Sequence, residues 1–123
     1  MKRDMELIRK ILLFLEEDDK PFKWKHVVIE GYDSRIISHH LKILNEANLI
    51  EAKPIVATKD RENWMARSLT WEGHEFLDSI KNDTVWKKIK DGIKSKGYEL
   101  GNIPIYALKE YAKLQFKQFF GIE

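Results

Sequence analysis

Two groups of polar and basic side chains have residue types that suit contact with a polyanion. The first group recurs at helical spacing over residues 34–42, and the second surrounds a polar stretch near residue 60. Arginine and lysine can bind phosphates or guanine edges, and serine and histidine can donate hydrogen bonds to phosphate or base acceptors. We therefore expect one surface that binds double-stranded DNA. Its predicted members are Ser34, Arg35, Ser38, His39 and Lys42, joined by Lys59, Arg61 and Arg67.

The overall charge does not select this partner. The 123 residues include 22 Lys and Arg and 20 Asp and Glu, and the formal net charge of +2 is too small to indicate a polyanion. Carboxylates also lie close to both groups, at Asp33, Glu46, Asp60 and Glu62. Contact with a host protein therefore remains the alternative use of the same surface.

A lysine-rich segment at 81–97 is a second basic feature. It holds six lysines against Asp83 and Asp91, and helical spacing would distribute the lysines around much of a helix. A solvated helix is the favoured interpretation, and a stripe that faces phosphates is the alternative.

The sequence offers no starting residue for catalysis. His39 and His40 are adjacent, so on a helix they point about 100° apart and cannot bind one ion from the same face. A site assembled from His40 and His74 is less favoured than a helix histidine whose ring is satisfied by a carbonyl group or by solvent. Gly-rich phosphate loops, zincin motifs and nucleophile elbows do not occur. We expect no enzyme activity, no cofactor and no metal.

The chain contains no cysteine, which suits a reducing compartment, and the cytoplasm is the expected location. No stretch approaches the ~20 apolar residues that cross a bilayer, so no membrane association is expected.

The four tryptophans lie in two kinds of predicted environment. Trp71 and Trp86 are predicted in the core, whereas Trp24 and Trp64 are candidate surface anchors for a partner.

A helix is predicted near the N-terminus, before the polar group at residues 34–42. It runs from a cap at Asp4 to about Glu17. Its apolar residues cover roughly half of the circumference, more than the arc of about 100° that an ordinary surface helix buries. We expect it to contact two neighbours, either the core and the C-terminal helix or the core and another subunit. Pro21 then interrupts helical structure.

A second predicted helix, capped by Asp33 or Ser34, carries the first group on its outer face. Strands are predicted at Val27–Ile29, 49–58 and 64–69, and they would form a small three-stranded antiparallel sheet whose polar connection is a hairpin tip. Only residues 21–32 are available for a helix before the second one, and they look extended. The inward residues of the second helix are Ile36, Ile37, His40, Leu41, Leu44 and Ala47.

Three further helices are predicted after the hairpin. Thr70 can cap a helix from Trp71 to about Ile80, Asp83 can cap another that ends before Gly97, and Pro104 suits the first turn of the last. Residues 1–97 then form one domain with a helical extension. Residues 98–123 form a C-terminal helix that packs on the same domain or on a dimer partner.

Two resemblances accompany this order of elements. The segment 37–50, followed by Leu69-Thr70-Trp71-Glu72-Gly73, resembles the recognition helix, wing and exit of MarR- and PadR-like winged-helix regulators. More closely, residues 1–13, 29–32 and 69–90 are similar to a bacterial and prophage family classed as a domain of unknown function. The close resemblance implies a small winged-helix protein and supplies no activity. The broader one implies that residues 34–42 read a groove and residues 59–67 form the wing.

The predicted fold class is α+β and mostly helical, namely a winged helix-turn-helix with a small antiparallel sheet and additional C-terminal helices. The predicted function is that of a non-enzymatic, DNA-binding transcriptional regulator from a bacterium or prophage. A homodimer is expected through the N- and C-terminal helices. The alternative is a protein-interaction module, such as a phage or mobile-element modulator of a host protein.

Overall fold

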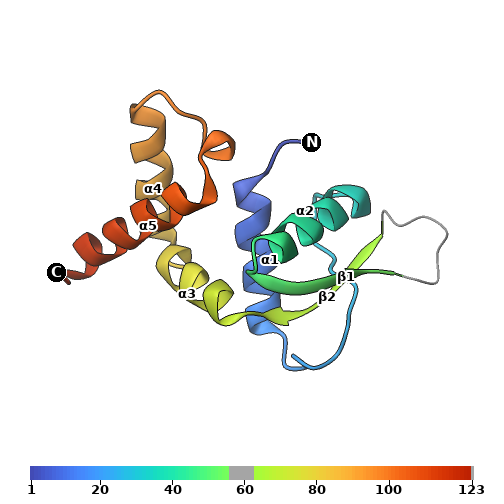
Figure 1. The fold of residues 1–123 in the computed structure, drawn as a ribbon. Helices are drawn as coiled ribbons and strands as arrows, with labels where there is room; N and C mark the ends of the chain where they lie inside the picture. The colour runs from blue at the N-terminus through green and yellow to red at the C-terminus, as the bar shows by residue number, and fades with distance from the viewer. Residues whose placement is uncertain (56–62, 123) are drawn as a thin grey trace.

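The structure is a computed structural model that describes residues 1–55 and 63–122. Within these residues the chain is α+β, as predicted, with helices on both sides of a central α1 and a two-stranded antiparallel hairpin at one end (Figure 1). The elements are α1 (Met5–Glu17), α2 (Ser34–Glu46), β1 (Ile50–Pro54), β2 (Trp64–Leu69), α3 (Trp71–Ile80), α4 (Asp83–Ser95), the 3-10 turn η1 (Leu100–Asn102) and α5 (Ile105–Phe120).

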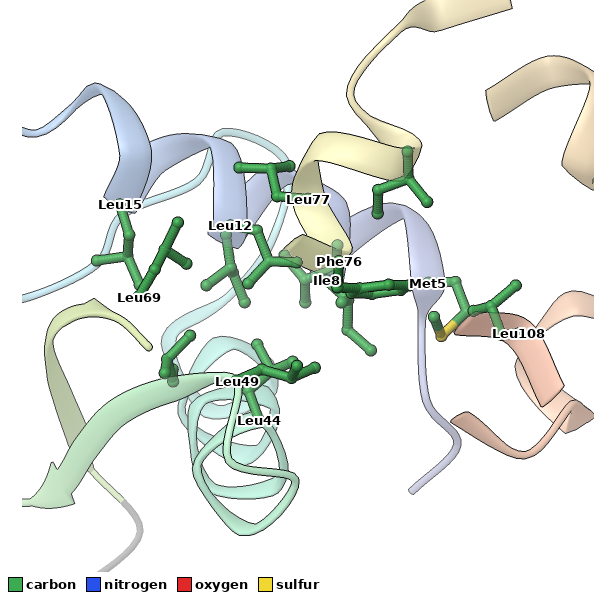
Figure 2. Close-up of a cluster of buried hydrophobic side chains, with 14 of the residues drawn as sticks. Met5, Ile8, Leu12, Leu15, Leu44, Leu49, Leu69, Phe76, Leu77 and Leu108 are labelled. Atoms are coloured by element: carbon green, nitrogen blue, oxygen red, sulfur yellow. The ribbon is translucent and has the colours of Figure 1, made fainter. Parts of the chain in front are cut away.

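Helix α1 lies at the centre of the hydrophobic core. The side chain of Asp4 accepts a hydrogen bond from the Leu7 amide, which confirms the predicted cap. Six apolar residues of α1 are buried, and the helix contacts α2, α3 and β2. Figure 2 shows Leu12 of α1 in the same cluster as Leu49 and Leu77. The wide apolar arc of α1 is therefore covered by its own chain, and no second subunit is needed to bury it.

Helix α2 follows an irregular segment, and no helix occurs between Glu17 and Ser34 in that fully described stretch. Asp33 caps α2 by accepting from the Ile36 amide. His40 is 1% exposed, and both of its ring nitrogens have partners. Its Nε2 accepts from the Asp4 amide at 2.8 Å, and its Nδ1 lies 2.8 Å from the Ile36 carbonyl oxygen. His40 is thus the satisfied core histidine that the sequence favoured.

The sheet has two strands among the described residues, so the predicted third strand at Val27–Ile29 is wrong. The extra pairing is a single bridge two residues earlier, in which Lys25 and Ala66 exchange backbone hydrogen bonds of 2.9 and 3.1 Å. The chain then leaves the sheet edge to reach the cap of α2, and it turns at Gly31, where φ is +88°. Pro54 ends β1 opposite Trp64, where its missing amide donor costs no ladder bond.

Helix α3 packs unusually close to the turn that precedes β1. Thr70 caps α3, as predicted, and its hydroxyl donates to the Asn48 carbonyl. Gly73 is buried, and a Cβ there would lie 1.9 Å from the Leu49 carbonyl oxygen. Trp71 was predicted in the core but is 76% exposed, because it lies on the side of α3 opposite the face formed by Gly73, Phe76, Leu77 and Ile80.

The last two helices pack on the same chain. Helix α4 is capped by Asn82, one residue before the predicted Asp83, and Trp86 is buried as predicted. Its indole Nε1 donates to Glu6 of α1. Helix α5 contacts α3 and α4 and buries Leu108 and Ala112. In the part of the chain that the structure describes, no helix is long and apolar enough to cross a membrane.

Candidate nucleic-acid interface

Helix α2 presents three of the predicted residues to solvent. Arg35 and Lys42 are exposed on the side of α2 that faces away from the core, and Ser34 is exposed at the start of the helix, on the side of Ile37 and Ser38. Lys42 pairs with Glu46 one turn later at 3.2 Å, and both side chains are more than half exposed. An exposed pair of this kind is worth only a few tenths of a kcal/mol. Lys42 can therefore exchange Glu46 for a phosphate at little cost.

Ser38 does not belong to this surface, and its predicted outward position is wrong. The residue is 5% exposed, and its Oγ accepts a hydrogen bond of 3.0 Å from the Trp64 amide of β2. Further along α2, the Asn45 side chain accepts from the Ala52 amide of β1. These two polar contacts join α2 to both strands, so Ser38 positions the helix against the hairpin.

His39 is half-buried beside His40, with the two rings edge to face at 5.6 Å. Burial is the main cause that lowers the pKa of His39 below its ordinary value of 6.5, and the neighbouring His40 acts in the same direction. The side chain is therefore uncharged at neutral pH. It can offer a hydrogen bond to a partner but no positive charge.

This lowered pKa predicts a pH dependence of stability. The unfolded chain binds the His39 proton more readily than the folded chain, so the free energy of unfolding falls as the pH drops below about 6.5. The loss continues until the pH passes the folded pKa. In urea titrations at a series of pH values, His39→Gln should flatten this decline. If the His39→Gln variant lost stability at low pH as steeply as the wild type, other titratable groups would be the cause of the loss.

Arg67 lies on the outer face of the hairpin and already has partners. Its Nε donates to Glu51 at 2.7 Å, and Nη2 bonds the same carboxylate oxygen. The guanidinium also lies 4.8 Å from the centre of the Trp24 ring. With Glu51 neutralising its charge, Arg67 contributes less to an anion-binding surface than the sequence predicted. Trp24 is half-buried under it rather than free on the surface.

Lys53 is a cation of the hairpin that the sequence interpretation missed. It is exposed, and its Nζ lies 4.2 Å from the centre of the Trp24 ring. Strand β1 alternates between buried Ile50 and Ala52 and the outward Glu51 and Lys53. That period of two is visible in the sequence and could have identified Lys53 as outward. The other two predicted wing residues, Lys59 and Arg61, lie outside the described residues.

A groove of about 470 Å³ joins α2 to the hairpin. It is bounded by residues 26–28, by the first turns of α2, which include Ser34, and by Ile55, Asn63 and Trp64 at the far end of the strands. Figure 1 shows the N-terminal part of α2 and this end of the hairpin on the same side of the molecule. Among the exposed residues of α2 named above, Ser34 borders this concave surface, whereas Arg35 and Lys42 do not line it.

The lysines of segment 81–97 do not join this surface. Figure 1 places α4 and the hairpin on opposite sides of α1. Two α4 lysines also have carboxylate partners, Lys87 with Asp91 at 2.8 Å and Lys90 with Glu6 of α1 at 2.7 Å. The arrangement is that of a solvated helix. Phosphate contacts shared between α4 and α2 would require a ligand that passes around α1.

Across the described residues, no group of three or more histidines, aspartates or glutamates is arranged to hold a metal ion. His74, which could have completed a pair with His40, is exposed on α3, whereas His40 is buried with both nitrogens engaged. The exposed side chains among the described residues offer hydrogen-bonding and cationic groups that a ligand can contact.

Comparisons with known proteins gave a family match and a relative. Residues 2–99 match the model of a family described as "Hypothetical protein (DUF2513)". The chain is also 41% identical over 119 residues to an "Uncharacterized protein" of Haemophilus influenzae, covering 96% of this chain and 98% of that protein. No solved structure matches the chain. From the family match over four-fifths of its length, the chain belongs to the DUF2513 family.

Proposed function

We propose that this protein binds duplex DNA through α2 and the β1–β2 hairpin and acts as a winged-helix transcriptional regulator without catalysis. The order α1, bridge segment, α2, β1, β2 corresponds to that of a winged helix in which an irregular segment replaces the second helix. In this assignment α2 is the groove-reading helix and the hairpin is the wing.

One observation carries the proposal. Ser34, the exposed first residue of α2, lines the concave surface that α2 shares with the hairpin, and the Ser38–Trp64 hydrogen bond holds these two elements together. A helix enters the major groove with its N-terminal residues toward the bases, while a neighbouring hairpin can reach the adjacent backbone. Arg35 near the start of α2 is in position to contact bases or phosphates. In this proposal Lys42 and Lys53 contact phosphates.

The test is fluorescence anisotropy with a labelled random-sequence duplex over a series of salt concentrations. Binding through several phosphates should weaken steeply as salt rises, with a slope of about −0.9 per phosphate on logarithmic axes. Binding that is absent at low salt, or that does not respond to salt, would contradict the proposal.

A protein partner is the second candidate, and the irregular segment before α2 favours it. Phe22 is 91% exposed and Val28 is 76% exposed, so this segment presents apolar groups to solvent. Exposed apolar residues of this kind are common at protein interfaces. The duplex titration separates the two candidates, because a module used for protein contact alone should show no salt-dependent affinity for DNA.

A further inference from the structure

A second groove, of about 450 Å³, lies between α3 and α5. Helix α5 lies on the side of α1 opposite the hairpin (Figure 1). Its two long walls have opposite charge. The α3 wall is acidic and the α5 wall is mainly basic, with Glu110 as the exception on α5. The charged groups that matter are Glu72, Glu75 and Asp78 on α3 and Lys109, Lys113 and Lys117 on α5.

The lysines of α5 follow a period of four residues, so they form a row along one side of that helix. The acidic residues of α3 recur every three residues and form a similar row. Each wall thus presents a row of like charges to a ligand in the groove, negative on α3 and positive on α5. A helix with a row of lysines would match the acidic wall, and α5 itself is such a helix.

Helix α5 also carries more apolar surface than its own chain covers. Two of its sixteen residues are buried, whereas Tyr106 is 72% exposed, Leu114 is 50% exposed and Phe120 is 51% exposed. At 100° per residue, Tyr106 and Phe120 fall on the same side of α5 as Lys113. The lysine row is therefore bordered by aromatic side chains that stay at least half exposed, even though the Phe120 ring contacts those of Phe116 and Phe119. An occupant with an apolar surface would remove them from water.

We propose that the groove is a dimer interface that receives α5 of a second copy of this chain. A two-fold axis makes the same contact twice, so one surface must be complementary to itself. The α3–α5 groove meets that condition, because the lysine row of each copy can lie against the acidic row of the other. The exposed aromatic residues of the two α5 helices would then meet near the axis.

This inference stands apart from DNA binding, since it uses neither α2 nor the hairpin. It differs from the dimer expected from the sequence, which included the N-terminal helix. Helix α1 is covered by its own chain, whereas α5 is not.

The test is a charge exchange measured by sedimentation equilibrium of the full chain. Glu75 and Lys113 are both exposed, so Glu75→Lys and Lys113→Glu should leave the far-ultraviolet circular dichroism unchanged. The wild type should dimerise at micromolar concentration. Each variant alone should dimerise at least about tenfold more weakly, because both symmetric contacts then bring like charges together.

The decisive sample is an equimolar mixture of the two variants. In a heterodimer of Glu75→Lys with Lys113→Glu, both symmetric contacts again pair opposite charges, so wild-type affinity should return. A mixture that behaves as two separate weak species would show that the rows interact only within one chain, and it would overturn the proposal. A wild-type chain that stays monomeric would overturn it as well and would leave the groove to a different protein.

Discussion

Gly73→Ala is expected to lower the free energy of unfolding by about 3 kcal/mol, the upper part of the range for inserting a methyl group into packed structure. The Cβ would lie 1.9 Å from the Leu49 carbonyl oxygen. That atom belongs to backbone, and the same carbonyl accepts the Thr70 amide at 3.1 Å. Helix α3 would have to move away from the turn before β1 and would lose contact with α1. Urea unfolding followed by circular dichroism measures the change.

Gly92→Ala is the matched control, because Gly92 is also inside a helix. A Cβ there would lie 1.9 Å from the Tyr111 hydroxyl, which is the end of a half-buried side chain that can rotate. Alanine also has the higher helix propensity, by about 1 kcal/mol. The two effects oppose each other, so Gly92→Ala should change stability by less than about 1 kcal/mol. Equal losses in both variants would contradict the close approach of α3 to Leu49.

The double variant Arg35→Ala with Lys42→Ala should weaken binding to duplex DNA by about 60-fold at 0.1 M salt. Each phosphate contact that releases a counterion contributes roughly eightfold at that concentration. The slope of log K against log salt should become shallower by about 2. Both residues are exposed, so the circular dichroism and the unfolding midpoint should remain close to those of the wild type.

The control for this prediction removes two charges from α4 instead. Lys87→Ala with Lys94→Ala changes the net charge equally and lies on the opposite side of α1 from the hairpin (Figure 1). Its affinity should stay within about threefold of the wild type, because no counterion is released by contact with these lysines. If the α4 variant lost as much affinity as the α2 variant, net charge rather than a defined surface would account for binding.

Local signals in the sequence were sufficient for most of the helices. Asp4, Asp33 and Thr70 cap the helices predicted for them, and the three- and four-residue spacing of apolar residues identified the buried faces of α1 and α2. Capping and helical periodicity act within a few residues of the chain. They can therefore be recognised without knowledge of the tertiary fold.

Most of the errors concern residues whose environment depends on a distant segment. Ser38 is buried because the Trp64 amide needs an acceptor, and the strand predicted at Val27–Ile29 is reduced to a bridge at Lys25. Trp71 was assigned by its apolar character, although its angular position on α3 already placed it outside. At the candidate site, Arg35 and Lys42 were predicted on the exposed face, and they are exposed. The Glu51 partner of Arg67 depends on strand register, which the sequence pattern alone did not specify.

The most direct test of the account is a set of amide correlation spectra of ¹⁵N-labelled protein during titration with a duplex. Contact through α2 and the hairpin should shift or broaden the amide signals of Ser34, Arg35, Lys42 and Lys53. The signals of α4 and of the α3–α5 groove should stay unchanged. Perturbations confined to α4, or spectra that do not change at low salt, would contradict the proposed interface.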